Sequence, residues 1–410
     1  MNRFALNVCV AVVMLAGCGG SQPLISAPSM MAQSPASTGY KSLYSFGKGT
    51  DGQEPKAALI DVNGALYGTT YKGGAYSDGT VFSMSTAGAE KVLYSFLGGN
   101  DGANPSASLL AVKGLLYGTT EYGGFPSYGG CNAGTVFRIS SLGAEKILYR
   151  FYGYYCHDHV YNDGANPIAS LIDVKGKFYG TTYGGGALPC FGDGCGTVYS
   201  ISKSGSEKVL HSFSGAYNDG ILPTASLINV NGTLYGTTEY GEGNGGSNSG
   251  YGTVFSVSTT GTENVLYNSP GGTGATIPLA GLINIKGTLY GTSAYGGADG
   301  PGTAFSITTS GSLTILHSFG SGTDGSNLYA ALLNVKGILY GTTEGGGTYG
   351  KGTVFSMSLT GTDEKVLHDF GHGSDGATPL AGLIEVNGTL YGTTSAGGAN
   401  RKGTVFALTP

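Results

Sequence analysis

The residues with the clearest chemical potential lie in one stretch, FYGYYCHDHVYNDGANP, residues 151–167. Four consecutive positions carry a thiol, a carboxylate and two imidazoles: Cys156, His157, Asp158 and His159. Thiols, imidazoles and carboxylates ligate zinc, and imidazoles and carboxylates also transfer protons. The matching stretch FLGGNDGANP, residues 96–105, is seven residues shorter and lacks these groups. The insertion is therefore the first place to look for function.

The chain has six cysteines, of which Cys9 and Cys18 lie near the N-terminus. The other four fall in the stretch 151–167 or in the long connectors of neighbouring repeats: Cys131, Cys156, Cys190 and Cys195. An even number of cysteines in an oxidising compartment predicts disulfides that stiffen long loops. Three pairings are possible, and we favour Cys190 with Cys195 and Cys131 with Cys156. The alternative is a zinc site that combines these thiols with His157 and His159, but neither C-x-x-C nor H-x-x-x-H spacing occurs. We predict no metal and no cofactor.

Aromatic side chains are concentrated in the same insertions. Such side chains on loops above a rigid scaffold stack on sugars or act as hot spots for a protein partner. The alternative is that the loops cover their own backbone and plug the fold. The binding residues that we predict are Tyr122, Phe125, Tyr128, Tyr154, Tyr155, His157, His159, Tyr161, Phe191, Tyr240 and Tyr251.

Acid and base groups are also present in the insertions, namely Glu121, His157, Asp158, His159, Asp193, Glu239 and Glu242. Their separations in space cannot be obtained from sequence, so the carboxylate-distance test for glycoside hydrolysis does not apply, and we assign no catalytic residue. Three hypotheses follow. The protein is a binding or scaffold module that recognises a glycan or protein partner, a carbohydrate-active lyase or glycosidase that uses the same face, or a purely structural component of the cell envelope.

The elements that must position these residues are repeated. The phrase LYGTT, or a close variant, places a tyrosine at positions 67, 117, 179, 235, 290, 340 and 391, so the unit is about fifty residues long. In the first unit, four strands are predicted, Ala58–Val62, Leu66–Thr70, Gly79–Met84 and Lys91–Phe96. The first is nearly continuous in apolar residues, which predicts burial on both faces. Asn-Gly or Lys-Gly then supplies a two-residue hairpin turn.

The two ends of the repeat region predict a closed ring. It opens with a lone fourth strand, Lys41–Phe46, and ends with only three strands, the last being Gly403–Leu408. A ring explains this permutation, because the first strand completes the last sheet and leaves no open edge. We therefore predict an all-β, seven-bladed β-propeller of four-stranded blades in one domain, residues 41–410.

The insertions should lie on one face of this ring. The connector between the second and third strands has eight residues in blades one, five, six and seven. It has thirteen in blades two, three and four, at 121–133, 183–195 and 239–251. In an up-and-down blade, this connector and the one after the fourth strand leave the same face. All the long insertions should therefore gather over three neighbouring blades.

The repeat also resembles a known family. LYGTTYKGG, followed by GTVFSMS and VLYSF, is similar to the GloVer-type tandem repeat of exported bacterial proteins, over about residues 41–410. The resemblance implies a secreted or surface-anchored protein. It implies no known reaction or substrate.

The N-terminus predicts export. Residues 1–17 combine a positive start, a short apolar stretch and small residues, as in a secretory signal. Leu15-Ala16-Gly17-Cys18 resembles the bacterial lipobox, which implies lipidation of Cys18; an ordinary cleaved signal is the alternative. Residues 18–40 predict a flexible tether. With Gly19 rather than Asp after the cysteine, we expect a lipid-anchored monomer at the outer membrane.

Charge excludes one class of partner. The net charge is -5, and no Lys/Arg cluster alternates with aromatic residues, so we predict no nucleic-acid binding. Six connectors contain Asp-Gly, at Asp51, Asp101, Asp163, Asp219, Asp324 and Asp375, which we interpret as turns rather than calcium sites. His211, His317 and His368 replace a repeated tyrosine and are predicted to be packing variants.

Overall fold

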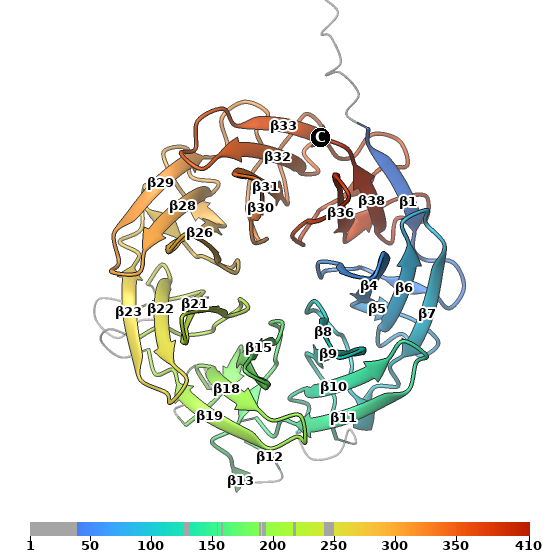
Figure 1. Cartoon of the computed structure of the whole chain (residues 1–410), viewed down its shortest axis with the longest axis vertical. Helices are drawn as coiled ribbons and strands as arrows, with labels where there is room; N and C mark the ends of the chain where they lie inside the picture. Colours follow the sequence, from blue (N-terminus) through green and yellow to red (C-terminus); the bar gives the residue numbers. More distant parts are fainter. Residues whose placement is uncertain are drawn as a thin grey trace, which may run out of the picture. The chain divides into compact units, whose positions relative to one another are not determined.

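The computed structural model describes residues 39–125, 131–153, 155–156, 159–187, 190, 194–215, 219–241 and 250–410. Within these residues, seven four-stranded antiparallel sheets are arranged as blades around a central axis (Figure 1). In each blade the innermost strand comes first in the chain order and the outermost strand last, except that β1 supplies the outermost strand of blade 7. The predicted all-β, seven-bladed propeller is therefore confirmed.

The strands of the blades have these bounds. Blade 1 contains β3 (Ile60–Val62), β4 (Ala65–Thr70), β6 (Thr80–Ser85) and β7 (Glu90–Ser95). Blade 2 contains β8 (Leu110–Val112), β9 (Leu115–Thr120), β10 (Thr135–Ser140) and β11 (Glu145–Arg150). Blade 3 contains β15 (Ile172–Val174), β16 (Lys177–Thr182), β18 (Thr197–Ile201) and β19 (Glu207–Ser212). Blade 4 contains β20 (Ile228–Val230), β21 (Thr233–Thr238), β22 (Thr253–Ser258) and β23 (Glu263–Asn268). Blade 5 contains β25 (Ile283–Ile285), β26 (Thr288–Ser293), β28 (Thr303–Thr308) and β29 (Leu313–Ser318). Blade 6 contains β30 (Leu333–Val335), β31 (Ile338–Thr343), β32 (Thr353–Ser358) and β33 (Lys365–Asp369). Blade 7 contains β35 (Ile384–Val386), β36 (Thr389–Thr394), β38 (Thr404–Leu408) and β1 (Lys41–Ser45).

Short strand pairs join the connectors between these sheets. They are β2 (Gly52–Gln53) with β5 (Lys72–Gly73), β14 (Gly164–Ala165) with β17 (Gly184–Gly185), β24 (Ala275–Thr276) with β27 (Tyr295–Gly296), and β34 (Gly376–Ala377) with β37 (Ala396–Gly397). In the insertion, β12 (Tyr155–Cys156) pairs with β13 (His159–Val160), and η1 (Gly99–Asp101) is a 3-10 turn.

Blade 7 closes as predicted. β1 pairs antiparallel with β38, with Lys41 opposite Ala407 and Ser45 opposite Thr404. The Asn400 amide then donates hydrogen bonds to the carbonyls of Ser45 and Phe46. Every residue of β38 is buried, so β1 covers an edge that would otherwise be exposed.

The innermost strands differ from the prediction. β3 begins at Ile60 rather than Ala58, and Asp61 in its middle is exposed. The innermost strand is the edge strand of its blade at the axis, so it is less buried than the two strands behind it. The Asp61 carboxylate accepts a hydrogen bond from the Gly64 N–H and so stabilises the hairpin turn.

Neighbouring blades pack through a repeated aromatic contact. Phe46 at the end of β1 is fully buried and lies edge-on to Phe82 of blade 1, with ring centroids 5.2 Å apart. The same contact recurs as Phe96–Phe137, Phe151–Tyr199, Phe213–Phe255, Phe319–Phe355 and Phe370–Phe406. The phenylalanine that ends the VLYSF phrase therefore connects the outermost strand to the next blade in six of the seven copies; blade 4 has Ser269 at this position.

The repeated Asp-Gly connectors contribute a second contact. Asp51 accepts hydrogen bonds from the backbone N–H groups of Gly47 and Lys48, in keeping with a turn, and from the Tyr44 hydroxyl at 2.8 Å. In three copies the tyrosine is replaced by a histidine, and His211, His317 and His368 contact Asp219, Asp324 and Asp375 in the same way. These histidines therefore substitute for tyrosine as partners of the buried carboxylate.

Both favoured disulfides are present, Cys131–Cys156 and Cys190–Cys195, each with 4.9 Å between Cα atoms. The zinc alternative for these thiols is therefore wrong, because each sulfur is bonded to another. The disulfides indicate an extracellular or periplasmic location. Within the described residues, no helix is long and apolar enough to cross a membrane.

Replacing Cys131 and Cys156 together by alanine should lower the free energy of unfolding by about 3 kcal/mol, because the bond closes a 25-residue separation. The Cys190 and Cys195 pair spans only five residues and should contribute less, about 2 kcal/mol. Urea unfolding of both double variants measures this order. Equal losses would contradict the loop-closure explanation.

Candidate binding site at the channel mouth

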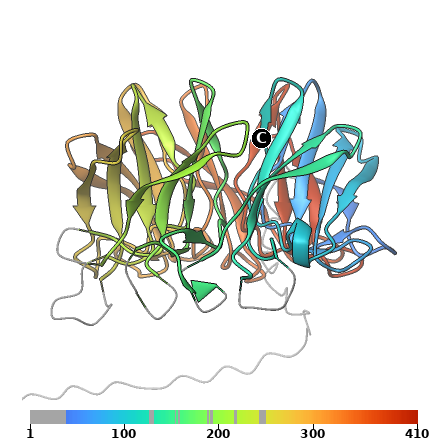
Figure 2. The same cartoon turned by 90° about the horizontal axis from the view of Figure 1, so that it is seen from below.

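The disc has two different faces (Figure 2). The loop face contains the connectors after the second and fourth strand of each blade, including η1 and β12–β13. The hairpin face contains the tight turns after the first and third strands, such as Asn63-Gly64, where Asn63 has a φ of 56°. The described parts of all the insertions thus lie on the loop face, as predicted.

A cavity of about 280 Å³ lies on the axis. Each blade contributes the segment that precedes its innermost strand, so Lys56, Ser106, Ile168, Thr224 and Tyr329 come together from far apart in the chain. The first threonine of each GTT phrase holds these segments in place. Thr69 is buried and donates a hydrogen bond to the Ala107 carbonyl of the next blade.

The other copies repeat this bond: Thr119–Ala169, Thr181–Ala225, Thr237–Ala280, Thr292–Ala330, Thr342–Ala381 and Thr393–Ala57. The second threonine, Thr70, bonds to the Lys72 carbonyl and to Thr80. Glycine precedes them because a Cβ on Gly68 would lie 2.6 Å from the Phe82 ring. The GTT phrase therefore sets the cavity wall and the path of the residue that follows it.

That following residue lies at the loop-face end of each second strand, next to the segments that line the cavity, and it varies between copies. In blade order it is Tyr71, Glu121, Tyr183, Glu239, Ala294, Glu344 and Ser395. Its backbone N–H is held in each copy by the connector from the preceding blade, for example Tyr71 N–H to the Glu54 carbonyl. The scaffold is thus constant while the side chain changes, which is the arrangement expected of a binding site.

Tyrosines and carboxylates alternate and interact across this mouth. Burial raises the pKa of Tyr71, and the charge and hydrogen bonding of Glu121 raise it further. Burial, and then the hydrogen bond to Glu121 and its charge, raise the pKa of the Tyr122 hydroxyl to about 12. The Lys56 ammonium lies 3.3 Å from the centroid of the Tyr71 ring. Burial lowers the pKa of Lys56, and the nearby charge of Glu121 partly offsets this.

The same pattern continues around the axis. Burial raises the pKa of Tyr183, as do the charge and hydrogen bonding of Glu239. Burial and then the charge of Glu344 raise the pKa of Tyr329, and Tyr295 is also in contact. We call these groups the mouth arc: Tyr71, Glu121, Tyr122, Tyr183, Glu239, Tyr240, Tyr295, Tyr329 and Glu344. It extends from blade 1 to blade 6 and adjoins the axial cavity through Lys56 and Tyr329.

A second pocket, of about 420 Å³, lies beside the mouth arc between blades 1 and 2. Tyr122, Asn104, Asn132 and Asp78 contribute polar groups to its wall. Burial raises the pKa of Asp78, and the charge of Asp101 adds to this. This pocket extends the polar, aromatic surface outward toward the long connector of blade 2.

The predicted binding residues divide into three groups. Tyr122 and Tyr240 are in the mouth arc. Phe125 and Tyr161 are further out, where they flank Tyr152 at 4.8 and 4.7 Å between ring centroids, and His159 lies edge-on to Tyr161. Tyr251 lies apart from both and is half exposed. Four predicted binding residues lie outside the described residues: Tyr128, Tyr154, His157 and Phe191. The same holds for the predicted lipidation site, Cys18, and for three of the acid and base groups, Asp158, Asp193 and Glu242. Of Tyr155 only the backbone is described.

The outer group, Phe125, Tyr152, Tyr161 and His159, packs largely against itself. Tyr152 and Tyr161 are stacked with an interplanar angle of 18°, so each ring covers one face of the other. This packing is what the plug alternative predicts for these rings. The mouth arc differs, because its rings contact carboxylates beside an open cavity.

Sequence reasoning missed five members of the mouth arc: Tyr71, Tyr183, Tyr295, Tyr329 and Glu344. Tyr71, Tyr295 and Glu344 belong to connectors of ordinary length, and Tyr329 precedes an innermost strand. Tyr183 begins the long connector 183–195 but is not among the predicted binding residues. A usable signal exists, because aligning the copies on the nearly constant GTT phrase shows that the residue directly after it varies and is tyrosine or glutamate in five of the seven copies.

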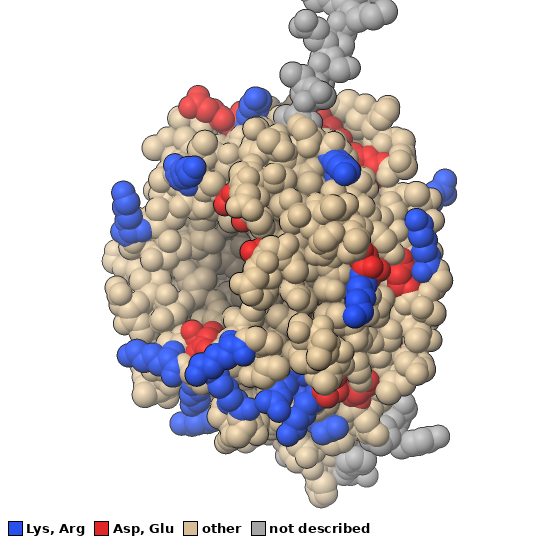
Figure 3. All heavy atoms as spheres, turned by 45° about the vertical axis from the view of Figure 1, so that its right-hand side comes forward, with Lys and Arg blue, Asp and Glu red and all other residues tan. Residues whose placement is uncertain are grey.

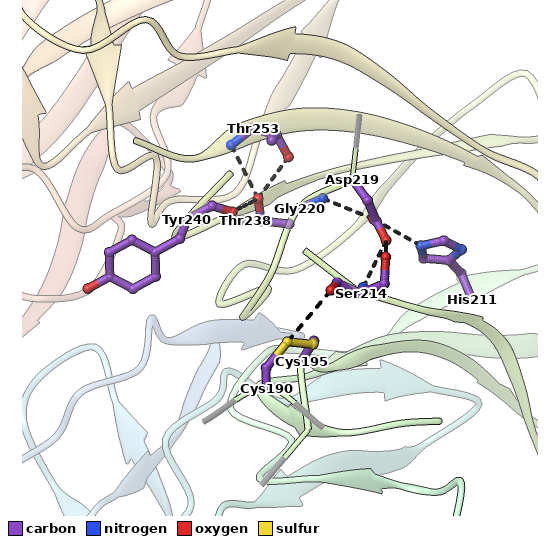
Figure 4. A network of polar contacts seen from close by, with 9 residues as sticks. All are labelled: Cys190, Cys195, His211, Ser214, Asp219, Gly220, Thr238, Tyr240 and Thr253. Atoms are coloured by element: carbon purple, nitrogen blue, oxygen red, sulfur yellow. Dashed lines mark hydrogen bonds and ion pairs between the residues drawn. A yellow bond between two sulfur atoms is a disulfide. The ribbon is translucent and has the colours of Figure 1, made fainter. Parts of the chain in front are cut away.

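A His–Asp–Glu group lies elsewhere on the loop face. Among the described residues, His211, Asp219 and Glu263 place potential metal-ligating atoms within 4.8 Å of one another. The Asp219 carboxylate already accepts hydrogen bonds from the Ser214 N–H and hydroxyl, the Gly220 N–H and His211 (Figure 4). Ser214 donates to the aspartate rather than to the histidine, so this is not the geometry of an activated serine.

The proximity of His211, Asp219 and Glu263 is a feature of the repeat and requires no bound ligand. Its aspartate–glutamate pair recurs as Asp51 with Glu90, Asp101 with Glu145 and Asp163 with Glu207, where tyrosine replaces the histidine. We therefore interpret it as a contact between blades.

Comparison with known proteins gives one family and one fold. Residues 29–248 and 240–410 match the model of the Gloeobacter/Verrucomicrobia repeat. No curated protein matches the chain in sequence. A puromycin hydrolase structure is similar, with 11% identity and a TM-score of 0.51 over 83% of this chain and 50% of that one.

Two further structures are similar. A Mycobacterium tuberculosis puromycin-hydrolyzing peptidase has 11% identity and a TM-score of 0.49 over 83% of this chain and 50% of that one. A Xanthomonas campestris gluconolactonase has 14% identity and a TM-score of 0.41 over 75% and 86%. The chain thus spans half the length of the two puromycin-hydrolysing proteins. At these identities the likeness concerns the fold alone.

Proposed function

Since the chain belongs to the Gloeobacter/Verrucomicrobia repeat family, whose repeats here build one complete propeller, we propose that it is an exported binding module that recognises a glycan at its channel mouth. The observation that carries this proposal is the mouth arc. One equivalent position of each blade follows the GTT phrase, and in five blades it carries tyrosine or glutamate. Lys56 and Tyr329, which line the axial cavity, interact with Tyr71 and Glu344 of this set.

The chemistry of the mouth arc suits a sugar. Tyrosine rings present apolar faces to the C–H groups of a sugar, and carboxylates accept hydrogen bonds from its hydroxyl groups. The axial cavity of about 280 Å³ admits a small polar group such as a terminal sugar, whereas a protein interface needs a much larger surface. Tyr183 and Glu239 occupy the centre of the arc, so we assign them the main contacts.

Export and anchoring complete the proposal. Residues 1–17 would be a signal peptide, Cys18 the lipidated residue and residues 18–40 a tether that holds a monomeric propeller at the outer membrane. Two disulfides agree with folding outside the cytoplasm. The acyl chains would be the membrane anchor.

A glycan array with the purified protein tests this function. Tyr183→Ser and Glu239→Ala copy the residues found at the same position in blades 7 and 5, Ser395 and Ala294, so the fold should tolerate them. Each should weaken binding at least tenfold, because a stacked ring or a charged hydrogen-bond acceptor is lost. Tyr349→Ala, an exposed tyrosine in the short connector of blade 6, is the matched control and should bind normally.

Three outcomes would contradict the proposal or redirect it. Unchanged binding by both mouth variants would exclude the arc. If shortening residues 151–167 to the pattern of residues 96–105 abolished binding while the mouth variants bound normally, the outer loops would be the site. If the unmodified protein cleaved the glycan and Glu239→Ala abolished this turnover, the protein would be a carbohydrate-active enzyme rather than a binding module.

A further inference from the structure

Basic side chains gather on the hairpin face over blades 2 and 3, although the whole chain is acidic. They come from the hairpin turns and from the strand ends beside them. We call them the basic patch: Lys113, Arg138, Lys146, Lys175, Lys177 and Lys203. Figure 3, which views this face obliquely, shows Lys and Arg side chains concentrated over its lower part, where Figure 1 places blades 2 and 3.

Few acidic groups neutralise this patch. Asp173 forms an ion pair with Lys203 at 3.6 Å. Glu145 and Glu207 are half-buried between blades, and burial followed by the charge of a neighbouring aspartate raises their pKa to about 7 and about 8. They therefore carry less than full negative charge near neutral pH, and the patch keeps a positive surplus.

Two of the lysines occupy positions where lysine is conformationally unfavourable. Lys113 and Lys175 have φ of 51° and 54° in the hairpin turns, a region that asparagine adopts more readily. Blades 1, 4 and 7 have asparagine at this position, whereas blades 5 and 6 also have lysine, Lys286 and Lys336. Arg138, Lys177 and Lys203 have no basic counterpart in the other blades, so these three residues distinguish blades 2 and 3 from the rest.

An apolar side chain projects from the same region. Leu142, in the turn between β10 and β11, is 89% exposed and stands between Arg138 and Lys146 in the chain. The same turn position is small or polar in the other complete copies, namely Ala87, Ser204, Thr260, Ser310 and Thr360. Cations that surround one projecting leucine form the combination that binds the interface of an anionic bilayer.

The chain also enters the fold at the hairpin face. β38 runs from the loop face to the hairpin face, and the Thr409 N–H, just past its end, bonds to the Gly39 carbonyl. Twenty residues, Gly19 to Thr38, precede this point. In the proposed function these residues connect the propeller to a lipid on Cys18, which would hold this face close to a membrane.

We propose that the basic patch and Leu142 dock the hairpin face onto an anionic lipid surface. The acidic mouth arc on the opposite face then points away from the membrane. Lipidation of Cys18, which is part of the proposed function, would strengthen this docking, but the docking itself depends only on side chains of the folded chain. It is independent of glycan binding at the mouth.

Vesicle sedimentation with an unacylated chain from Gly19 to Pro410 tests the docking. Every described strand and both disulfides lie within this segment. It should bind phosphatidylglycerol vesicles and not phosphatidylcholine vesicles. The triple variant Lys113→Asn, Lys175→Asn and Lys177→Thr copies residues of other blades and should lower binding by more than about a hundredfold, at roughly fivefold per lysine.

Two further variants identify the surface and its occupant. The control is a second triple variant, Lys48→Ala, Lys351→Ala and Lys402→Ala, which removes three positive charges from exposed residues of the loop face. It should bind anionic vesicles almost normally. Leu142→Thr copies blades 4 and 6 and should weaken vesicle binding by up to about tenfold, while binding to dextran sulfate stays unchanged.

Several results would overturn the proposal. They are no binding of the starting chain to anionic vesicles, equal losses in the two triple variants, or normal vesicle binding by Leu142→Thr. With the last result, the occupant would be an acidic polymer rather than a lipid. Thermal unfolding of each variant verifies that the propeller is intact. Glycan binding should be unaffected in all of them, so failure of the docking and failure of the proposed function are distinguishable.

Discussion

Deletion of residues 1–47 is expected to lower the free energy of unfolding by more than about 5 kcal/mol and to cause aggregation. The deletion removes Phe46, which is fully buried against Leu59, Leu66 and Phe82 of blade 1. Loss of one such phenylalanine costs about 3 to 5 kcal/mol by itself. It also removes Tyr40, whose ring stacks on His368 at 3.7 Å.

The same deletion exposes the edge of β38, an otherwise buried strand whose unpaired N–H and C=O groups favour association with other chains. The control lacks only residues 1–38 and keeps β1. Thermal unfolding and size-exclusion chromatography compare the two chains. Equal melting temperatures would mean that the Thr393–Ala57 hydrogen bond and the core of blade 7 close the ring without β1.

The stability of the propeller should fall as pH rises from about 5 to 8.5. Five glutamates at the start of outermost strands are half-buried between blades: Glu90, Glu145, Glu207, Glu263 and Glu364. Burial, and then the charge of an aspartate in the neighbouring connector, raises the pKa of Glu207 to about 8 and that of the others to about 7. In each, one carboxyl oxygen is buried without a hydrogen-bond partner.

The direction follows from proton binding. In the unfolded chain these groups have a pKa near 4.5, so between pH 4.5 and 8 the folded chain binds more protons. Their contribution to stability is complete below pH 4.5 and is lost as pH rises through 7 to 8. A hydrogen bond with Tyr44 for Glu90, and the electrostatic effect of His211 for Glu263, partly oppose the shift. Burial also raises the pKa of Asp163 and Glu344, which acts in the same direction.

Glu207→Gln tests this explanation, because glutamine has the shape of the neutral acid and cannot ionise. Urea unfolding at pH 5.5 and 8.5 should show that the free energy of unfolding falls less between these pH values in this variant than in the unmodified protein. Solvent screens half-buried groups, so the expected gain at pH 8.5 is on the order of 1 kcal/mol. Asp299→Asn, at an exposed carboxylate, is the control and should keep the original pH dependence. A Glu207→Gln protein with that same dependence would contradict the assignment.

The architecture could be predicted from the sequence because it depends on short-range features. Each Asn-Gly or Lys-Gly turn, each alternation of apolar residues and each GTT phrase acts within a few residues, and seven copies repeat the signal. Closure by Lys41–Ser45 followed from counting strands at the two ends. The pairings Cys131–Cys156 and Cys190–Cys195 followed from which connectors share a face. The bounds of β3 did not follow, because an apolar run does not reveal which side borders the axis.

Only the tertiary structure decided where the chemistry gathers. Tyr183 and Glu239 are 56 residues apart, and they meet because closure of the ring brings one position of every blade to the same axis. The separation of charge has a similar origin. Strands alternate in direction, so whether a turn reaches the loop face or the hairpin face depends on its place in the blade, and side chains scattered along the chain collect on two opposite surfaces. The face on which a side chain lies therefore cannot be read from the residue alone, because it depends on the arrangement of all seven blades.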